Sequence, residues 1–480
     1  MSDFRKKEQI KVEIQGEGTF SLEKGENVLS VLITQGLFET AHCAGHGTCG
    51  KCAVRFVGEA PLPKPADRRH FTPGQLREGW RLACMAKPQK DCVIAKLERV
   101  SGGFILDKTL IGDLNKNSEM PGGESETVVL ADLGTTTIVL LLVEQHTGKI
   151  LDVYKKRNRQ RSYGADVISR IERAVAGDGM ELSRLVNGDL QSVLQHWKDM
   201  GYGPREMVLA GNTVMVHLLK GLSVEGLTKA PFVPVTTDSV SFEAAGVSGR
   251  TVPGISAFVG GDIVAGMLAC KKEMEKDGIK NALLIDLGTN GEMVLFTGKG
   301  NFCTATAAGP AFDGGFGGAI FGSDVIRITA TLLERGVIDE TGLLAEEYFE
   351  TGFYDGQCCF RQQDIRTLQT AKAAVFAGIR ILLEEAGLSE NEIEKVYLAG
   401  GFGYQLSVDS ACAIGLIPSI WRERTMPAGN TALAGAYLYA LGVQAEDVIK
   451  NTKSINLAEK DRFNGYYLQA MNLREERDFS

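Results

Sequence analysis

The sequence lacks three features that would assign it to broad classes of protein. No run of apolar residues approaches the roughly 20 that a helix needs to cross a bilayer. The opening stretch, MSDFRKKEQIKVEIQ, is polar and lacks the apolar segment that a signal peptide contains. Basic residues are not in excess, since the formal charge is −8, which disfavours a nucleic-acid partner. We therefore expect a cytoplasmic protein that binds neither a membrane nor nucleic acid.

Disulfides are a further feature that we do not expect, because cytoplasmic thiols are kept reduced. The chain nevertheless contains 10 cysteines among its 480 residues. Three of them stand in the stretch HCAGHGTCGKC at residues 42–52. So dense a group of thiols predicts a metal centre.

The spacing of the cysteines favours one kind of metal centre. The pattern is C-x5-C-x2-C followed by a distant cysteine, and its members are Cys43, Cys49, Cys52 and Cys84. Four thiolates so spaced can bind a two-iron cluster, two on each iron. A zinc site made from the same cysteines is the alternative. His42 and His46 would suit a Rieske centre only if they came from separate loops, so we interpret them as neighbouring or surface groups.

Periodicity divides the chain into segments. Residues 8–15 alternate apolar and polar, as in a half-buried strand, and short strands recur around one helix from about Asn27. Residues 112–126 contain no large apolar residue other than Leu114 and Met120, which is typical of a linker. The sequence therefore predicts a small β-rich domain at 1–98 and a linker at 99–126.

The rest of the chain contains an internal repeat. DLGTTT at Asp132 returns as DLGTNG at Asp286, each after an apolar strand. Each copy is followed by helical stretches and then by an apolar strand that runs into a glycine turn, at 205–215 and 394–403. This pattern predicts two α/β lobes, residues 127–275 and 276–480, and we expect the polar C-terminal segment to pack back as a cap.

The Gly-Thr turns indicate a nucleotide site. Small residues at strand ends let backbone N–H groups approach an anion, and threonine hydroxyls add donors. We assign phosphate binding to Gly134, Thr135, Thr136, Thr137, Gly288, Thr289, Asn290, Gly291 and Glu292. Asp132 and Asp286 are the candidate catalytic residues, and each could hold Mg²⁺ through water. Hairpins that use glycine only for tight geometry are the alternative.

Two further stretches can belong to this site. LAGGFG at 398–403 offers Gly400, Gly401 and Gly403 to the adenine or ribose, and GPAFDGG at 309–315 would lie by the entrance of the second lobe. Asp262, in GGDIVAG, either faces the magnesium ion or is simply the N-cap of a helix.

Six stretches of the sequence together resemble the motifs of the reductive activators of corrinoid enzymes. They are VVLADLGTTT, VLAGNTVM, VGGDIVAG, LLIDLGTNGE, TAAGPAFDGG and LAGGFG. The resemblance implies an α/β fold: an N-terminal β-grasp ferredoxin-like domain and two ribonuclease-H-like lobes of the actin, heat-shock-chaperone and sugar-kinase superfold. It implies the ATP-dependent one-electron reduction of a corrinoid protein from Co(II) to Co(I), with the electron supplied through a 2Fe–2S cluster. ATP and Mg²⁺ are the other implied cofactors. The implied partners are a corrinoid protein of a methyltransferase system and a low-potential electron donor, and a homodimer is left open.

Three other functions are compatible with parts of the sequence. The first is a small-molecule kinase of the same superfold with a redox-regulatory ferredoxin domain. The second is a redox-sensing scaffold whose ATP site only sets conformation. The third is an activator of a dehydratase, but such activators hold a four-iron cluster between two chains. No matching cysteine pair is evident, and we interpret Cys358 and Cys359 as bystanders.

Overall fold

The computed structural model describes residues 9–15, 18–34, 47, 52–71, 73–95, 126–308, 322–354, 359–400 and 406–473. The chain forms two compact units, residues 1–102 with 157–186 and residues 103–156 with 187–480. The predicted linker lies outside the described residues except for Glu126. None of the described helices combines the length and apolar character needed to span a membrane.

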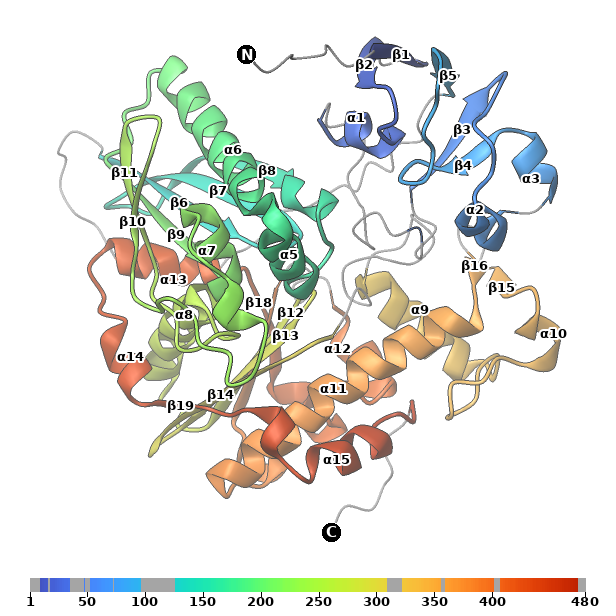
Figure 1. The fold of residues 1–480 in the computed structure, drawn as a ribbon. Coiled ribbons are helices and arrows are strands. Elements are labelled where there is room, and N and C mark those ends of the chain that lie inside the picture. Colours follow the sequence, from blue (N-terminus) through green and yellow to red (C-terminus); the bar gives the residue numbers. More distant parts are fainter. Residues whose placement is uncertain are drawn as a thin grey trace. The chain divides into compact units, whose positions relative to one another are not determined.

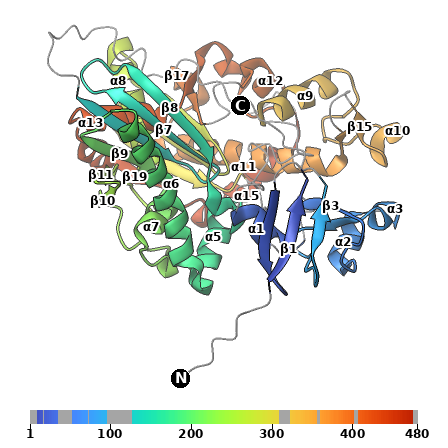
Figure 2. The ribbon, with the colours of Figure 1, turned by 90° about the horizontal axis from the view of Figure 1, so that it is seen from above.

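The first unit contains a five-stranded mixed sheet in the order β2-β1-β5-β3-β4 (Figures 1 and 2). The strands are β1 (Gln9–Ile14), β2 (Gly18–Glu23), β3 (Ala53–Val57), β4 (Trp80–Leu82) and β5 (Cys92–Ile94). Alternate residues of β1 are buried, so Ile10, Val12 and Ile14 enter a core with Val28 and Leu32 of α1 (Val28–Thr34). Short helices α2 (Pro65–His70) and α3 (Pro73–Arg77) precede β4. The predicted β-grasp domain is confirmed.

The second unit begins with a six-stranded sheet in the order β10-β11-β9-β6-β7-β8 (Figure 1). The strands are β6 (Thr127–Leu133), β7 (Thr137–Glu144), β8 (Ile150–Arg157), β9 (Glu206–Gly211), β10 (Ser241–Ala244) and β11 (Val247–Thr251). Strand β6 is antiparallel to β7 and parallel to β9, which is parallel to β11. Nearly every residue of β6 and β7 is buried, as expected for strands covered on both faces.

A second six-stranded sheet in the same unit has the order β18-β17-β12-β13-β14-β19. Its five strands from β18 to β14 repeat the order β11-β9-β6-β7-β8 of the first sheet. The strands are β12 (Ala282–Leu287), β13 (Gly291–Thr297), β14 (Gly300–Thr306), β17 (Lys395–Ala399), β18 (Thr425–Gly429) and β19 (Thr452–Ser454). Strand β12 is antiparallel to β13 and parallel to β17, as β6 is to β7 and β9. The internal repeat is therefore structural, and the two ribonuclease-H-like lobes are confirmed.

Two helices join the lobes. Helix α8 (Gly261–Asp277) leads from the first lobe into β12, and α13 (Thr431–Ala440) follows β18 of the second lobe. They pack closely because small residues meet: a Cβ added to Gly435 would lie 1.7 Å from the carbonyl oxygen of Ala265. Helix α13 is also tied to the first lobe, since Tyr437 donates to the carbonyl of Gln145 at 3.1 Å. Apolar residues of both lobes thus share one core.

The described part of the C-terminal segment packs on the second lobe. Helix α15 (Phe463–Gln469) lies along α11 (Gln362–Ala386). The buried Lys372 of α11 donates to the carbonyl oxygens of Ala470 and Asn472, and Gln369 donates to that of Met471 at 2.6 Å. These bonds satisfy a buried ammonium group and hold residues 470–472 on the second lobe.

Candidate functional site

The sheet of the first unit brings two of the four predicted cluster cysteines together. Strands β3 and β4 pair Ala53 with Leu82, and the ladder continues through a bond from the Ala83 N–H to the Cys52 carbonyl at 2.7 Å. Cys52 and Cys84 therefore lie side by side, with their Sγ atoms 3.2 Å apart. Both are buried, with 2% and 3% of their surface exposed. Two buried thiols this close can bind the same metal centre.

One described residue of the predicted cluster loop, Gly47, contacts the rest of the unit. It has φ +69°, and a Cβ there would lie 3.0 Å from Cβ of Ala66 and 3.1 Å from Cγ of Met85. Its carbonyl accepts a bond from Nε2 of His70 at 3.2 Å. Gly47 therefore lies against α2 and against the residue that follows Cys84. Cys43, Cys49, His42 and His46 lie outside the described residues.

Asp132 and Asp286 occupy equivalent positions in the two lobes. Each is the residue before the last of the first strand of its sheet. Asp132 is level with Ala210 of β9, and Asp286 is level with Ala399 of β17. Parallel strands end at the same edge, so each carboxylate stands beside a glycine turn, Gly211 or Gly400.

The two Gly-Thr turns meet. The Thr136 and Thr289 hydroxyls lie 3.1 Å apart and form a hydrogen bond between the lobes. Within each turn the glycine N–H is used locally: Gly134 donates to the Thr137 carbonyl at 3.0 Å, and Gly288 donates to that of Asn290 at 2.9 Å. The glycines therefore do serve tight turns, as the alternative interpretation expects. The same two turns also face each other, as the nucleotide prediction requires.

Two of the predicted glycines make room for neighbouring elements of the fold. A Cβ on Gly291 would lie 2.9 Å from Cγ2 of Val375, so this glycine makes room for α11. Gly400, with φ +95°, lies directly against the end of β12, where a Cβ would be 2.7 Å from Oδ1 of Asp286. Gly401, Gly403 and residues 309–315 lie outside the described residues.

Acidic side chains gather where the lobes meet, and burial raises their pKa values. Burial raises the pKa of Asp132 to about 6, against the opposing effects of a bond from Asn430 and the charge of Lys155. Burial and the nearby Asp262 and Asp132 raise the pKa of Asp286 to about 8. Burial also raises the pKa of Glu292 well above its usual range. The group is therefore short of positive charge.

Asp262 belongs to this group, and one of its two predicted roles is wrong. The N-cap of α8 is Gly260, and the helix begins at Gly261. A Cβ on Gly260 would lie 2.4 Å from Cα of Asn212, and one on Gly261 would lie 2.1 Å from the Val252 carbonyl oxygen. Only glycine fits at these two positions, which are the N-cap and the first residue of the helix. Asp262 is therefore the second residue of the helix and not its N-cap. Burial, together with the charge of Asp132, raises the pKa of Asp262 to about 7.

Sequence reasoning missed two asparagines of this site. Asn212 donates to Oγ1 of Thr135 at 3.1 Å, and Asn430 donates to Oδ2 of Asp132 at 2.6 Å. Each is also the N-cap of the helix that follows, α7 (Thr213–Lys220) or α13. The signal was present, because the tetrapeptide AGNT occurs at both 210–213 and 428–431.

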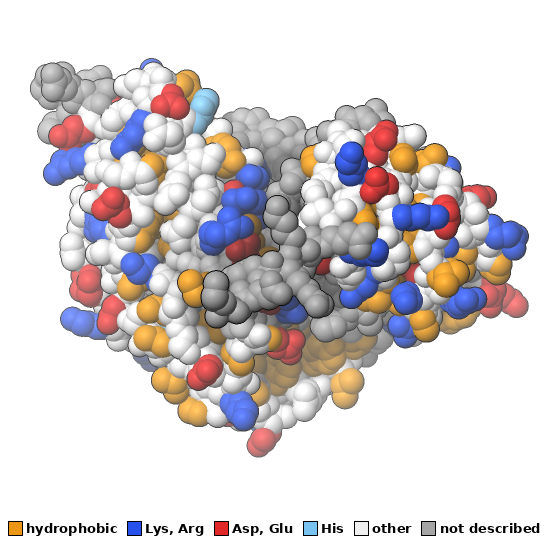
Figure 3. All heavy atoms as spheres, turned by 45° about the horizontal axis from the view of Figure 1, so that its top comes forward, with side chains coloured by type: hydrophobic (Ala, Val, Ile, Leu, Met, Phe, Trp, Pro, Cys, Tyr) orange, Lys and Arg blue, Asp and Glu red, His pale blue; other side chains and the backbone are white. Residues whose placement is uncertain are grey.

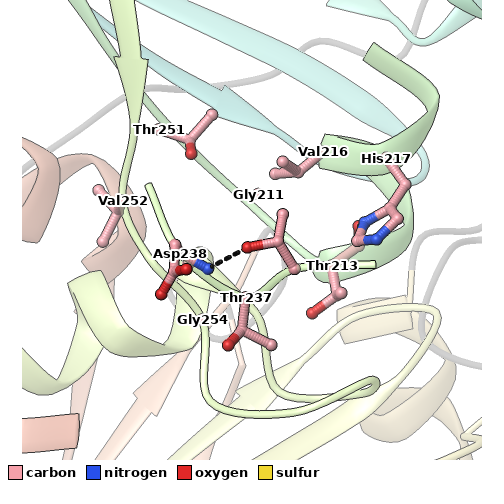
Figure 4. Close-up of a pocket in the computed structure, with 11 residues that line it drawn as sticks. Gly211, Thr213, Val216, His217, Thr237, Asp238, Thr251, Val252 and Gly254 are labelled. Carbon is pink, nitrogen blue, oxygen red and sulfur yellow. Dashed lines mark hydrogen bonds between the residues drawn. The ribbon is translucent and has the colours of Figure 1, made fainter. Parts of the chain in front are cut away.

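A small pocket opens beside this site in the first lobe (Figure 4). Its polar lining includes Thr213, Thr237, Asp238 and Thr251. His217 is fully buried there, with Nδ1 donating to the Thr213 carbonyl at 2.7 Å and Nε2 accepting from the Val235 N–H at 3.1 Å. The space holds about one water molecule, so it is not the nucleotide site.

Comparison with protein families finds three matches along the chain. Residues 12–89 match the 2Fe–2S iron-sulfur cluster binding domain. Residues 128–277 match the RACo middle region, and residues 280–318 and 317–479 match the C-terminal domain of RACo, the ASKHA domain. The two RACo models together span nearly three quarters of the chain.

Individual proteins agree with these matches. The corrinoid activation enzyme RamQ of Eubacterium limosum is 27% identical, over 73% of this chain and 71% of its own length. A solved reductive activator for corrinoid, iron-sulfur protein is 23% identical with a TM-score of 0.65, and the match covers 97% of this chain and 98% of the other, which shows the same fold. A component of the Na⁺-translocating NADH-quinone reductase of Chlamydia pneumoniae is 35% identical over 107 residues, 22% of this chain and 25% of that protein.

Proposed function

The chain belongs to the RACo family, and we propose that it catalyses the ATP-dependent one-electron reduction of a corrinoid protein from Co(II) to Co(I). In this proposal the electron passes through a 2Fe–2S cluster in the first unit. One observation carries it: a cluster-type pair of buried cysteines and a two-lobed site of facing Gly-Thr turns occur in the same chain.

The residues of the first unit suit an iron-sulfur cluster. Cys52 and Cys84 would supply two thiolates from the sheet, and Cys43 and Cys49 would supply two from the loop. A bound cluster would carry one electron at a time. Burial of Cys52 and Cys84 would keep water from the sulfurs, and the glycine-rich loop would offer them N–H groups.

The residues between the lobes suit a nucleotide with a divalent cation. The Thr136 and Thr289 hydroxyls would donate to phosphate oxygens from opposite lobes, and Mg²⁺ would relieve the shortage of positive charge around Asp132 and Asp286. Among the described residues, no three acidic, histidine or cysteine side chains converge enough to enclose an ion. We therefore expect water molecules to complete its coordination, as is usual for Mg²⁺ in phosphate sites.

The contacts of α13 suggest how the nucleotide site drives the reaction. Asn430 ties the start of α13 to Asp132, while Arg250 of β11 donates to the Tyr439 carbonyl at 3.2 Å near its end. A step that is uphill by about 200 mV is disfavoured by a few thousandfold. Nucleotide can offset this only by binding one arrangement of the lobes better than another, and the interlobe helices would transmit that difference.

Anaerobic absorption spectroscopy tests the proposal. The chemically reduced protein is mixed with a Co(II) corrinoid protein, with and without MgATP, and we expect Co(I) to form only with MgATP. The control is Asp286→Asn, which should keep the cluster spectrum but lose the effect of MgATP. Phosphate transfer to a small acceptor, independent of the cluster and without Co(I), would instead establish the kinase alternative.

A further inference from the structure

An exposed basic surface with an apolar centre lies in the first unit. We define it by Leu62, Lys64, Arg68, Arg69 and His70, all exposed to solvent. Leu62 is 86% exposed. Figure 3 shows acidic and basic side chains interspersed over much of the face that it presents, and the chain as a whole is acidic. Residues 60–71, however, include one acidic residue, Asp67, and its side chain is buried. Every exposed charge there is positive.

Two buried charged residues hold this surface in place. Asp67, 1% exposed, accepts from the Lys64 N–H at 2.6 Å and from the Leu82 N–H at 2.7 Å. Arg81, 5% exposed, donates to the Pro61 carbonyl at 2.6 Å and to that of Leu76 at 2.9 Å. Both fix the segment to β4, whose end leads to Cys84. The large apolar side chain is thus displayed on a rigid support, which lowers the entropic cost of binding a partner.

The basic surface also adjoins the cluster loop. His70 donates to the carbonyl of Gly47, which precedes Cys49 by two positions and so lies within about 8 Å of it along the chain. Ala66, in the same helix, packs on Gly47. A protein bound to this surface would be close to the loop that holds the cluster.

We infer that the basic surface is where the electron enters: it docks an acidic, low-potential one-electron carrier protein. Docking uses the complementary charges and places Leu62 against an apolar spot on the carrier. The carrier is oxidised by one electron and the cluster is reduced by one electron, with no bond made or broken. This inference rests on the proposed function, since it requires the cluster.

The structure favours the donor over the corrinoid protein as the occupant. The bonds that hold the surface all lie within residues 47–82, and none involves the nucleotide-binding lobes. Docking should therefore be independent of ATP. The corrinoid partner, by contrast, must respond to nucleotide if ATP is to drive its reduction.

Binding and electron transfer test this inference in the full-length protein. The probe is an acidic flavodoxin: its oxidised form for calorimetric titration against the oxidised protein, and its hydroquinone for stopped-flow reduction of the cluster. We expect Arg68→Glu with Arg69→Glu to weaken binding and slow cluster reduction by about tenfold at low salt, with the difference shrinking as salt rises. Leu62→Ser should weaken binding about fivefold at every salt concentration. MgATP should change none of these values.

The matched control reverses two exposed cations elsewhere. Lys271→Glu with Lys272→Glu, on the exposed side of α8, makes the same change of net charge and should bind flavodoxin as the unaltered protein does. Equal losses in both double variants would show a net-charge effect and overturn the inference. So would undetectable binding of flavodoxin to the unaltered protein.

Chemical reduction separates this inference from the proposed function. With dithionite as reductant, the Arg68→Glu and Arg69→Glu variant should form Co(I) as fast as the unaltered protein. If it binds flavodoxin normally but fails to form Co(I) with dithionite, the surface docks the corrinoid protein and the inference is wrong. If no variant forms Co(I) but flavodoxin binding follows the expected pattern, the proposed function fails while the docking surface stands.

Discussion

Asn430 offers a sharp test of the nucleotide site, because its side chain makes two separable bonds. Its Nδ2 donates to Oδ2 of Asp132 at 2.6 Å, and its Oδ1 accepts from the Leu433 N–H at 2.8 Å as the N-cap of α13. Asn430→Ser keeps an N-cap acceptor and removes the donor to Asp132. Asn430→Asp also keeps the acceptor but sets a second carboxylate against Asp132.

The expected losses of stability follow from these bonds. A hydrogen bond to a charged group contributes about 1.5–3 kcal/mol, so Asn430→Ser should lower the free energy of unfolding by about 2 kcal/mol. Asn430→Asp should cost at least about 1 kcal/mol more, because like charges would then face each other in a partly buried place. A divalent cation beside Asp132 would attract the added carboxylate. With MgATP, the extra loss in Asn430→Asp should therefore disappear.

Urea unfolding followed by tryptophan fluorescence measures these differences. Trp197 and Trp421 are fully buried, one in each lobe, and report on the second unit. The titrations are run above the pKa of about 6 of Asp132, where its carboxylate is ionised. The reasoning fails if Asn430→Asp is as stable as Asn430→Ser without MgATP, or if MgATP leaves their difference unchanged.

Three other predictions follow from the site and its supports. The folded pKa values of Asp132 and Asp286 are about 6 and 8, whereas the ordinary value is 3.8, so the folded protein binds more protons than the unfolded chain from about pH 4 to pH 8. Its melting temperature without nucleotide should therefore fall as the pH rises through this range. Saturating MgATP should reduce this dependence of the melting temperature on pH. Cys52→Ser should abolish the visible absorption of the reconstituted cluster while far-ultraviolet circular dichroism stays unchanged, and a retained spectrum would exclude Cys52 as a ligand. Gly435→Val should lower the thermal midpoint by several degrees, because its side chain would collide with the Ala265 backbone; an unchanged midpoint would contradict the close helix packing.

The sequence predicted the repeated strands well, because buried strands carry strong local signals. The apolar runs that include Asp132 and Asp286 became β6 and β12. Gly211 is the last residue of β9, and Gly400 directly follows β17. The repeat also placed both aspartates correctly at strand ends. Such features depend on residues close in sequence, so periodicity and spacing suffice to find them.

Contacts between distant residues could not be predicted in the same way. The bond from Asn430 to Asp132 joins residues 298 positions apart. The start of α8 depended on Gly260 and Gly261 lying against the backbone of other elements, so Asp262 was open to a wrong interpretation as the N-cap. The buried Lys372 likewise has its partners about 100 residues away. Local propensity contains no information about such tertiary partners.

In the proposed function, the arrangement of charge would make closure of the lobes on a nucleotide depend on a bound cation. Asp132 and Asp262 belong to the first lobe, and Asp286 and Glu292 to the second. The charges of the first lobe raise the pKa values of both groups of the second lobe. Without a cation, the lobes can approach only if these carboxyl groups take up protons or accept repulsion. A bound cation removes that cost, and Asn430 connects Asp132 directly to the helix that packs on α8. Cation and phosphate would therefore favour the closed arrangement through α13, the same helix that carries the second lobe against the first.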